Sequence, residues 1–167
     1  MRRLRWESSS RKRRNLLFQQ RASALREDEE KFRIMVEKLP QPLYMSVGPE
    51  QKCVYLNPAF TQLFGYTMEE VPTVEQWWPL AYPDEAYRRQ ISEEWTARVK
   101  HAIETKSSIE PMEVTVTCKD GSKKFVSWYY VSIGEKNYAY AIDLTKRKQA
   151  EDEKDQLQGQ LNQSRKM

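Results

Sequence analysis

The sequence is short of the residues that most catalytic and metal sites need. Its 167 residues include two cysteines and a single histidine, His101. Cys53 and Cys118 lie far apart and follow no CxxC spacing, which favours reduced thiols over a disulfide framework. With one histidine, zinc sites of the Cys/His kind and Ser-His-Asp or Cys-His catalytic arrangements lack the side chains they require.

Long hydrophobic runs are also missing. No stretch of eighteen apolar residues occurs, and no apolar segment follows the basic residues near the amino terminus. The sequence therefore predicts neither a membrane span nor a secretory signal, and we expect a cytoplasmic protein. A hydrophobic content of 39% over this length suffices for one core of ordinary size.

Positive charge is not spread through the chain. The net charge of +4 arises near the amino terminus, whereas the residues after position 14 hold 21 basic and 23 acidic side chains. We interpret residues 1–14 as a basic, disordered tail and expect no nucleic acid on the core. The alternative is that this tail contacts anionic lipid or nucleic acid. Its cations are Arg2, Arg3, Arg5, Arg11, Lys12, Arg13 and Arg14.

Residues 15–39 contain no proline or glycine and predict one long helix. Apolar side chains recur every seven positions at Phe18, Leu25, Phe32 and Leu39. Such a stripe packs either on a partner helix, as a coiled coil, or on the body of its own domain, and the pattern leaves both open.

Residues 40–143 predict an α+β domain. Two hairpins flank a helical segment, and together they can form one five-stranded antiparallel sheet with helices on one face. Two separate subdomains are disfavoured, because a lone hairpin has too little core. The predicted strands are 43–47, 52–56, 112–118, 123–133 and 138–143.

Several turn and cap residues support these boundaries. Asn57 and Pro58 form a good helix start, and Gly65 can end that helix. Asp120 and Gly121 form the pair that tight hairpin turns prefer. Residues 144–167 are rich in Lys, Glu, Gln and Asp, and they predict a polar helix.

Five segments resemble successive landmarks of a PAS domain with its PAC tail, over about 120 residues. The resemblance implies the sheet-and-helices architecture and a sensory module of bacterial signalling proteins, such as two-component systems. The segments are YLNPAF at 55–60, LFGY at 63–66, YPDE at 82–85, KDGS at 119–122 and IDLTKRKQAE at 142–151.

The resemblance also implies residue roles. Asn57 would cap the helix that closes over the pocket, and Gly65 with Tyr66 would shape its exit. Asp143 and Thr145 would form the hinge where the last strand becomes the output helix. Asp143 and Arg147 stand four residues apart, so we expect an ion pair between them. The alternative is that Asp143 only ends the strand and Arg147 is only a solvent-exposed residue of the helix.

An aromatic interior could hold a small organic ligand or pack completely as core. The candidate pocket residues share large apolar or aromatic side chains. They are Met45, Tyr55, Phe60, Phe64, Trp77, Trp78, Tyr87, Ile91, Trp95, Val116, Trp128 and Tyr140.

Two family cofactors are disfavoured. Haem sensors of this family use a histidine on the long helix near the pocket, whereas His101 lies near that helix's far end. Flavin photosensors place a reactive cysteine in an Asn-Cys-Arg context after the second strand. Here that place reads Asn57-Pro58-Ala59, which argues against covalent flavin chemistry.

We therefore predict a regulatory module rather than an enzyme. Its flanking helices would form a homodimer and pass a signal to an effector beyond Met167, of the histidine kinase or diguanylate cyclase class. No nucleophile–base pair, phosphate loop or paired-carboxylate arrangement is recognisable in the sequence. The alternative function is a nucleic-acid or membrane-surface adaptor that uses the basic residues 2–14.

Overall fold

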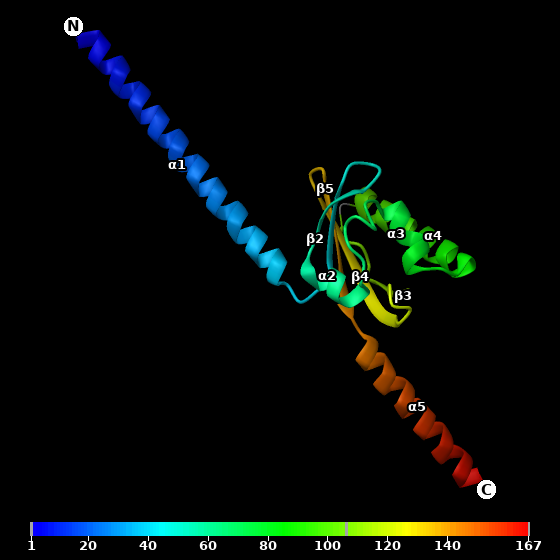
Figure 1. The fold of residues 1–167 in the computed structure, drawn as a ribbon. Helices are drawn as coiled ribbons and strands as arrows, with labels where there is room; N and C mark the ends of the chain where they lie inside the picture. The colour runs from blue at the N-terminus through cyan, green and yellow to red at the C-terminus, as the bar shows by residue number, and fades with distance from the viewer. Residues whose placement is uncertain (1, 106, 167) are drawn as a thin grey trace. The chain divides into compact units, whose positions relative to one another are not determined.

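The computed structural model describes residues 2–105 and 107–166, and the chain divides into two compact units. The first unit, Met1–Lys38, contains helix α1, and the second, Leu39–Met167, contains the sheet and the other helices. Figure 1 shows the elements in chain order.

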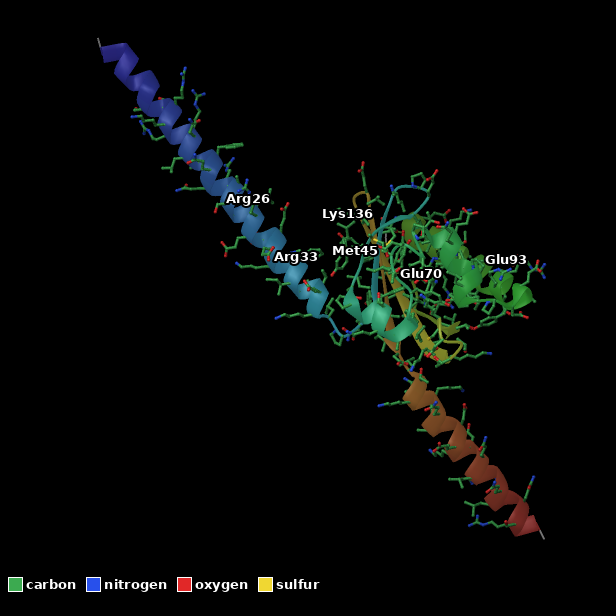
Figure 2. All side chains as sticks on the ribbon, in the orientation of Figure 1. Arg26, Arg33, Met45, Glu70, Glu93 and Lys136 are labelled. Carbon is green, nitrogen blue, oxygen red and sulfur yellow. The ribbon has the colours of Figure 1, made fainter. Side chains whose placement is uncertain are left out.

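Helix α1 spans Arg2–Lys38. The described part of the predicted disordered tail, residues 2–14, is helical, because no glycine or proline interrupts the helix and arginine, lysine and leucine are good helix formers. Its polar surface carries local ion pairs, such as those of Arg33 with Glu30 and Glu37. Figure 2 labels Arg33 on this helix. Three side chains of the predicted apolar stripe are exposed, namely Phe18, Leu25 and Phe32.

The strands of the described residues form one five-stranded antiparallel sheet in the order β2-β1-β5-β4-β3. β1 lies between β2 and β5, and Tyr44 faces Leu56 on one side and Ala139 on the other. The predicted fold, with both hairpins in a single sheet, is therefore confirmed. The strands are β1 (Leu43–Val47), β2 (Lys52–Leu56), β3 (Met112–Thr117), β4 (Lys123–Ile133) and β5 (Lys136–Asp143).

Strand β5 begins earlier than predicted. Ile133 pairs directly with Lys136, so only two residues connect β4 to β5. Gly134 has a φ of 61°, a left-handed conformation that glycine adopts without strain. The tighter turn lengthens the hairpin and brings Asn137 into register with Ser132.

Helices α2 (Pro58–Phe64), α3 (Val74–Ala81) and α4 (Glu85–Thr105) cover one face of the sheet (Figure 1). Their apolar side chains and those of the sheet's inner face make one core. Its members include Phe60, Phe64, Trp77, Ile91, Val114, Val116, Val126 and Trp128.

Helix α3 was not predicted as a separate helix. The side chain of Thr73 caps it by accepting a hydrogen bond from the N–H of Gln76 at 3.3 Å. Pro79 lies inside it, and a proline within an apolar run indicates a break rather than a helix. Burial of Trp77 and Ala81 against the core stabilises the helix despite that proline.

Asn57 joins three segments at the base of the domain. Its Oδ1 accepts hydrogen bonds from the N–H groups of Phe60 at 3.1 Å and Leu43 at 2.8 Å. Its Nδ2 donates to the carbonyls of Gln41 at 2.8 Å and Leu39 at 3.5 Å. Besides capping α2, which Pro58 opens at its first position, Asn57 therefore ties that helix to the start of β1.

Gly65 ends α2 with a φ of 83° and lies against the β3–β4 turn. A Cβ at this position would meet Cβ of Lys119 at 3.0 Å, and the N–H of Lys119 donates to the carbonyl of Phe64 at 2.9 Å. The Tyr66 hydroxyl continues the connection, because it donates to the carbonyl of Thr117 at 3.2 Å. Only glycine fits this close left-handed approach.

The β3–β4 turn is closed by Asp120 and Gly121. Oδ1 of Asp120 accepts from the N–H and hydroxyl of Ser122, and these bonds lower the pKa of the carboxyl. Gly121 has a φ of 84°, and its N–H donates to the carbonyl of Cys118 at 2.9 Å.

Helix α5 covers Thr145–Lys166 and follows β5 with one residue between them. Its apolar side chains Leu157 and Leu161 are exposed. None of the helices in the described part of the chain is long and apolar enough to cross a membrane.

Candidate functional site

A cavity of about 50 Å³ lies between the sheet's inner face and the helices. Its floor comes from alternate residues of the strands, and its roof from α2, α3 and α4. It is lined by Tyr44, Ser46, Gln51, Phe60, Val74, Trp77, Trp78, Tyr82, Trp95, Met112, Trp128, Tyr130, Asn137 and Ala139.

Trp77 contacts four other aromatic rings in the core around the cavity. Its ring centroid lies 5.2 Å from Phe60, 5.5 Å from Phe64, 5.8 Å from Tyr66 and 6.1 Å from Trp128. The contacts with Phe64, Tyr66 and Trp128 are edge to face, a geometry that stabilises a packed core beyond the burial of area. Most of the interior is therefore filled, and only a small space remains.

No charged residue is among those that line the cavity, and two of its tyrosine hydroxyls are hydrogen-bonded to other lining residues. The Tyr44 hydroxyl donates to the carbonyl of Gln51 at 3.2 Å, and the Tyr130 hydroxyl donates to Oδ1 of Asn137 at 2.8 Å. Burial raises the pKa of the Tyr44 hydroxyl and of the Tyr130 hydroxyl above their ordinary values. Both tyrosines are consequently neutral donors.

Tyr82 and Trp128 form the deepest polar pair. Burial raises the pKa of the Tyr82 hydroxyl, and the neighbouring Trp128 indole opposes that rise. The indole N–H is the donor of this pair and the Tyr82 hydroxyl oxygen the nearby acceptor, but their contact falls outside full hydrogen-bond geometry, and Nε1 has no other partner among the described residues. Such a donor is uncommon in a folded interior.

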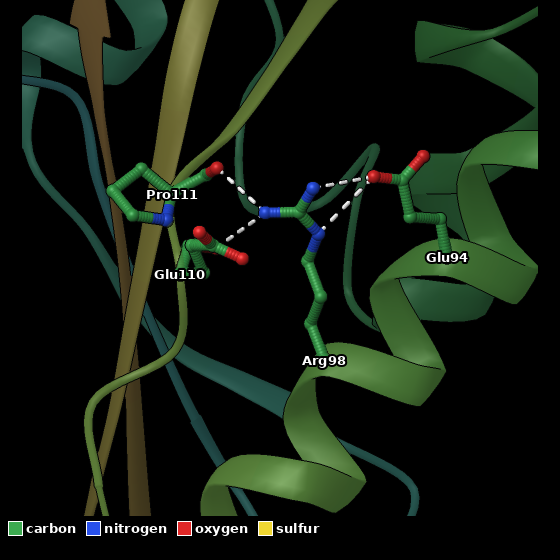
Figure 3. Close-up of polar contacts among 4 residues, drawn as sticks. All are labelled: Glu94, Arg98, Glu110 and Pro111. Atoms are coloured by element: carbon green, nitrogen blue, oxygen red, sulfur yellow. Dashed lines mark hydrogen bonds and ion pairs between the residues drawn. The ribbon is translucent and has the colours of Figure 1, made fainter.

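Helix α4 is clamped to the start of β3 through Arg98 (Figure 3). Its guanidinium donates to the carbonyls of Glu110 at 2.9 Å and Pro111 at 2.7 Å, and its Nε donates to Glu94 at 3.1 Å. One turn earlier, Trp95 meets the Tyr130 ring edge to face, with centroids 5.8 Å apart. The clamp thus holds α4 where Trp95 closes the cavity.

The junction between β5 and α5 is tied to β4. Oδ1 of Asp143 accepts hydrogen bonds from the N–H and hydroxyl of Thr145. The Thr145 hydroxyl oxygen accepts from the N–H of Phe125 at 3.0 Å, while the N–H of Leu144 donates to the carbonyl of Phe125 at 2.8 Å. The first turn of α5 is therefore fixed to the same strand that carries Trp128.

The PAS fold family matches residues 36–149, which covers the sheet, the cavity and the junction. The chain belongs to the PAS fold family. This makes residues 36–149 a PAS sensory domain, whereas no curated protein matches the sequence.

Solved structures share the fold of this PAS domain. A sensory box histidine kinase/response regulator from Burkholderia thailandensis E264 has a TM-score of 0.55 at 18% identity, covering 80% of this chain and 98% of that one. The PAS domain of a Colwellia psychrerythraea protein has a TM-score of 0.55 at 19% identity, covering 70% and 97%. At these identities the likeness shows the fold alone.

A light-oxygen-voltage receptor is also similar. The structure described as an RNA-binding Light-Oxygen-Voltage receptor has a TM-score of 0.57 at 20% identity and covers 78% of this chain. The chain spans 37% of that receptor's length, so the match concerns its sensory fold only.

Five of the predicted pocket residues line the cavity of the PAS domain, and four lie in the core around it. The lining group is Phe60, Trp77, Trp78, Trp95 and Trp128. The core group is Phe64, Tyr87, Ile91 and Val116. Among these, Tyr87 has a specific polar contact, because its hydroxyl accepts from the N–H of Thr115 on edge strand β3 at 3.0 Å.

The predicted pocket is wrong for three residues, which lie on the other face of the sheet: Met45, Tyr55 and Tyr140. Met45, on β1 in Figure 2, pairs with Tyr55 and alternates with Tyr44, which faces the cavity. Tyr140 stacks on Tyr129 with ring centroids 4.8 Å apart, away from the helices.

Nine lining residues were missed from the sequence. Those on strands could have been identified from the alternation of side chains between the two faces, once one inward-facing residue of each strand was known. Tyr82 could have been found from its place in the YPDE segment, and no local pattern indicated Gln51 or Val74. The nine are Tyr44, Ser46, Gln51, Val74, Tyr82, Met112, Tyr130, Asn137 and Ala139.

The cavity's residues do not fit a haem or a covalently held flavin. His101 is exposed on α4 and does not line the cavity. Cys53 and Cys118 are buried elsewhere in the core, and burial raises the pKa of each thiol. The volume is also several times below the roughly 300 Å³ at which ordinary ligand pockets begin.

No group of His, Cys, Asp and Glu in the described ranges 2–105 and 107–166 is arranged to hold a metal ion.

The predicted Asp143–Arg147 ion pair is corrected by the structure. Nε of Arg147 lies 3.1 Å from Oε1 of Glu151, while Asp143 binds Thr145. Both Arg147 and Glu151 belong to α5, where a spacing of four brings side chains together. Asp143 belongs to the extended strand β5, so the same spacing does not bring it to Arg147.

Proposed function

We propose that this PAS domain relays a signal from its cavity to helix α5 and dimerises through its flanking helices. The output would act on an effector of the histidine kinase or diguanylate cyclase class in a longer protein. The observation that carries the proposal is the hydroxyl of Thr145, which bridges the N–H of Phe125 on β4 and the carboxylate of Asp143 at the base of α5.

Strand β4 connects the cavity to the start of helix α5. Trp128 lines the cavity, and Phe125, three residues earlier on the same strand, holds the start of α5. Nζ of Lys148, in the first turn of α5, also lies 6.0 Å from the Phe125 ring centroid. A shift of β4 caused by filling the cavity would therefore change the hydrogen bonds that orient α5.

Exposed apolar side chains support dimerisation through the flanking helices. On α1, Leu25 is 61% exposed, and on α5, Leu157 is 60% exposed. Contiguous apolar side chains on otherwise charged helices favour association with another helix. The effector class is supported by the fold shared with a sensory box histidine kinase/response regulator.

Hydrogen exchange of the α5 amides tests the relay. The substitution Ala139→Val adds two methyl groups to the cavity wall and imitates an occupied cavity. We expect it to change the protection of amides 148–151, the first that are bonded within the helix, about fivefold, the effect of roughly one hydrogen bond. In a Thr145→Val background the change should disappear, because valine keeps the shape of threonine without the hydroxyl.

Thr145→Ser is the matched control, since serine retains the bridging hydroxyl and should preserve the response. Equal responses in the valine and serine backgrounds would refute the route through Thr145. Dimerisation is tested separately by sedimentation of the full chain at tens of micromolar, where a strict monomer would rule out the dimer.

A further inference from the structure

Helix α1 carries a dense run of positive charge outside the PAS domain. Residues 11–14 read Arg-Lys-Arg-Arg, all four side chains are exposed, and Arg21 is a further exposed cation. No aspartate or glutamate occurs between positions 8 and 26. Because ion pairs within a helix join residues three or four apart, the helix contains no acidic partner for residues 12–14 or for Arg21. We call residues 11–14 the cationic segment.

The cations of this segment surround the helix instead of sharing one face. Successive residues of an α-helix point about 100° apart, so four adjacent cations cover its whole circumference. A helix that lies on a membrane needs one face that is apolar and free of charge. The cationic segment has no such face, which argues against an anionic lipid surface. A polyanion that surrounds the helix on several sides matches the arrangement.

Duplex DNA offers this geometry in its major groove. The groove is about 12 Å wide and admits an α-helix between the phosphates of its two walls. The major groove of duplex RNA is deep and too narrow for side chains to read. The partner that the cationic segment fits is therefore duplex DNA.

The apolar stripe of α1 begins just after the cationic segment. Phe18, Leu25 and Phe32 follow one another at seven-residue intervals, and all three are exposed. One interval before Phe18 stands Arg11, so two helices paired along the stripe would bring their Arg11 side chains together. Repulsion between these cations would separate the helices about 10 Å before Phe18. Figure 1 shows that α1 continues through this point as one helix.

The order of the two features on α1 matches a known way of holding DNA. A basic segment followed by heptads on one continuous helix lets a coiled coil hold two helices together while the basic segments fork across the major groove. We propose that α1 pairs with α1 of a second copy from Phe18 onward and that the two cationic segments grip duplex DNA. The DNA contact rests on the dimer of the proposed function and adds a partner to it.

Fluorescence anisotropy tests the full chain against a labelled DNA duplex of about 20 base pairs, roughly two helical turns. Four cations from each of two copies give about eight phosphate contacts, so log K should fall with log salt with a slope of about −7. We expect a Kd on the order of ten micromolar at about 0.1 M salt. An RNA duplex of the same sequence should bind at least about tenfold more weakly. Absence of DNA binding, or equal binding of the two duplexes, would overturn the inference.

A triple variant locates the contact on α1. Lys12→Gln, Arg13→Gln and Arg14→Gln together remove about six of the eight contacts, while glutamine preserves the helix. The slope should fall to about −2, and the affinity for DNA should fall on the order of a hundredfold. An unchanged slope would refute the role of the cationic segment.

The matched control removes the same charge from the sheet. Its three positions are exposed, and the substitutions are Lys52→Gln, Lys123→Gln and Lys136→Gln. We expect this variant to change the affinity for DNA less than about threefold, because only charges at the contact release counterions. Equal losses in the two triple variants would show that net charge alone attracts DNA and would overturn the inference.

Vesicles of phosphatidylserine and phosphatidylcholine test the membrane alternative. Salt-sensitive binding to these vesicles without binding to duplex DNA would overturn the inference. Failure of the proposed dimer is separable by sedimentation. A strict monomer that binds DNA with about half the slope would refute the dimer and the paired grip but keep the DNA contact of a single helix. A dimer that binds no DNA would refute the DNA contact alone.

Discussion

Replacing Asn57 by alanine should destabilise the domain more than the loss of an ordinary helix cap. The side chain is fully buried, and it bonds Leu43, Phe60 and Gln41 at once. Loss of the cap costs about 1 kcal/mol. The N–H of Leu43 and the carbonyl of Gln41 would each lose a partner, at about 1–3 kcal/mol apiece. We expect a total loss of about 3–7 kcal/mol.

Urea unfolding followed by tryptophan fluorescence measures this loss, because Trp77 and Trp128 report the core directly. The same loss corresponds to a fall in melting temperature of roughly 6–28 °C for a chain of this length. The control is Asn162→Ala on α5, an exposed position that should change stability by less than about 0.5 kcal/mol. A loss below about 1 kcal/mol in Asn57→Ala would show that the three segments do not depend on this side chain.

Two further predictions concern a glycine and a buried phenol. Gly65→Ala should destabilise the domain by about 1–2 kcal/mol in urea, because the φ of Gly65 is positive and Lys119 lies against it. The control Gly159→Ala should instead raise the helical circular dichroism of α5. A free energy of unfolding that Gly65→Ala leaves unchanged would contradict the close approach of Lys119. Burial raises the pKa of Tyr82, so stability should be full below pH 10 and fall as the pH rises further, by up to about 1.4 kcal/mol per pH unit for this group. Tyr82→Phe should flatten the dependence of the urea midpoint on pH between 9 and 11, and an unchanged slope would count against burial of that hydroxyl.

Element types and most boundaries were predictable because they follow from local rules. The β4 range of Lys123–Ile133 and the hairpin of β1 and β2 have the strand-forming composition and turn residues that their positions require. The Asn57 cap and the glycine at position 65 are likewise decided by neighbours within a few residues. Helix α3 was not predicted as a separate element, because the burial of Trp77 and Ala81 that stabilises it despite Pro79 depends on the tertiary core.

The face of β1 could not be predicted. Leu43, Tyr44, Met45 and Ser46 are all buried, so the strand shows no alternation between polar and apolar residues. The strand is buried on both faces because it lies between β2 and β5. Since β5 lies about 90 residues away in the chain, no local pattern indicates this pairing. Met45 was consequently assigned to the cavity that Tyr44 lines.

The sequence by itself determined that the chain would form two hairpins around a helical segment, with helices at both ends, because spacing, caps and turns act over a few residues. Only the tertiary structure decided which side chains meet in the cavity, that the Trp128 indole lies beside the Tyr82 hydroxyl, and that Thr145 rather than Arg147 binds Asp143. Those outcomes depend on the register between strands that are distant in the sequence. A shift of that register by one residue would move every side chain of a strand to the other face of the sheet.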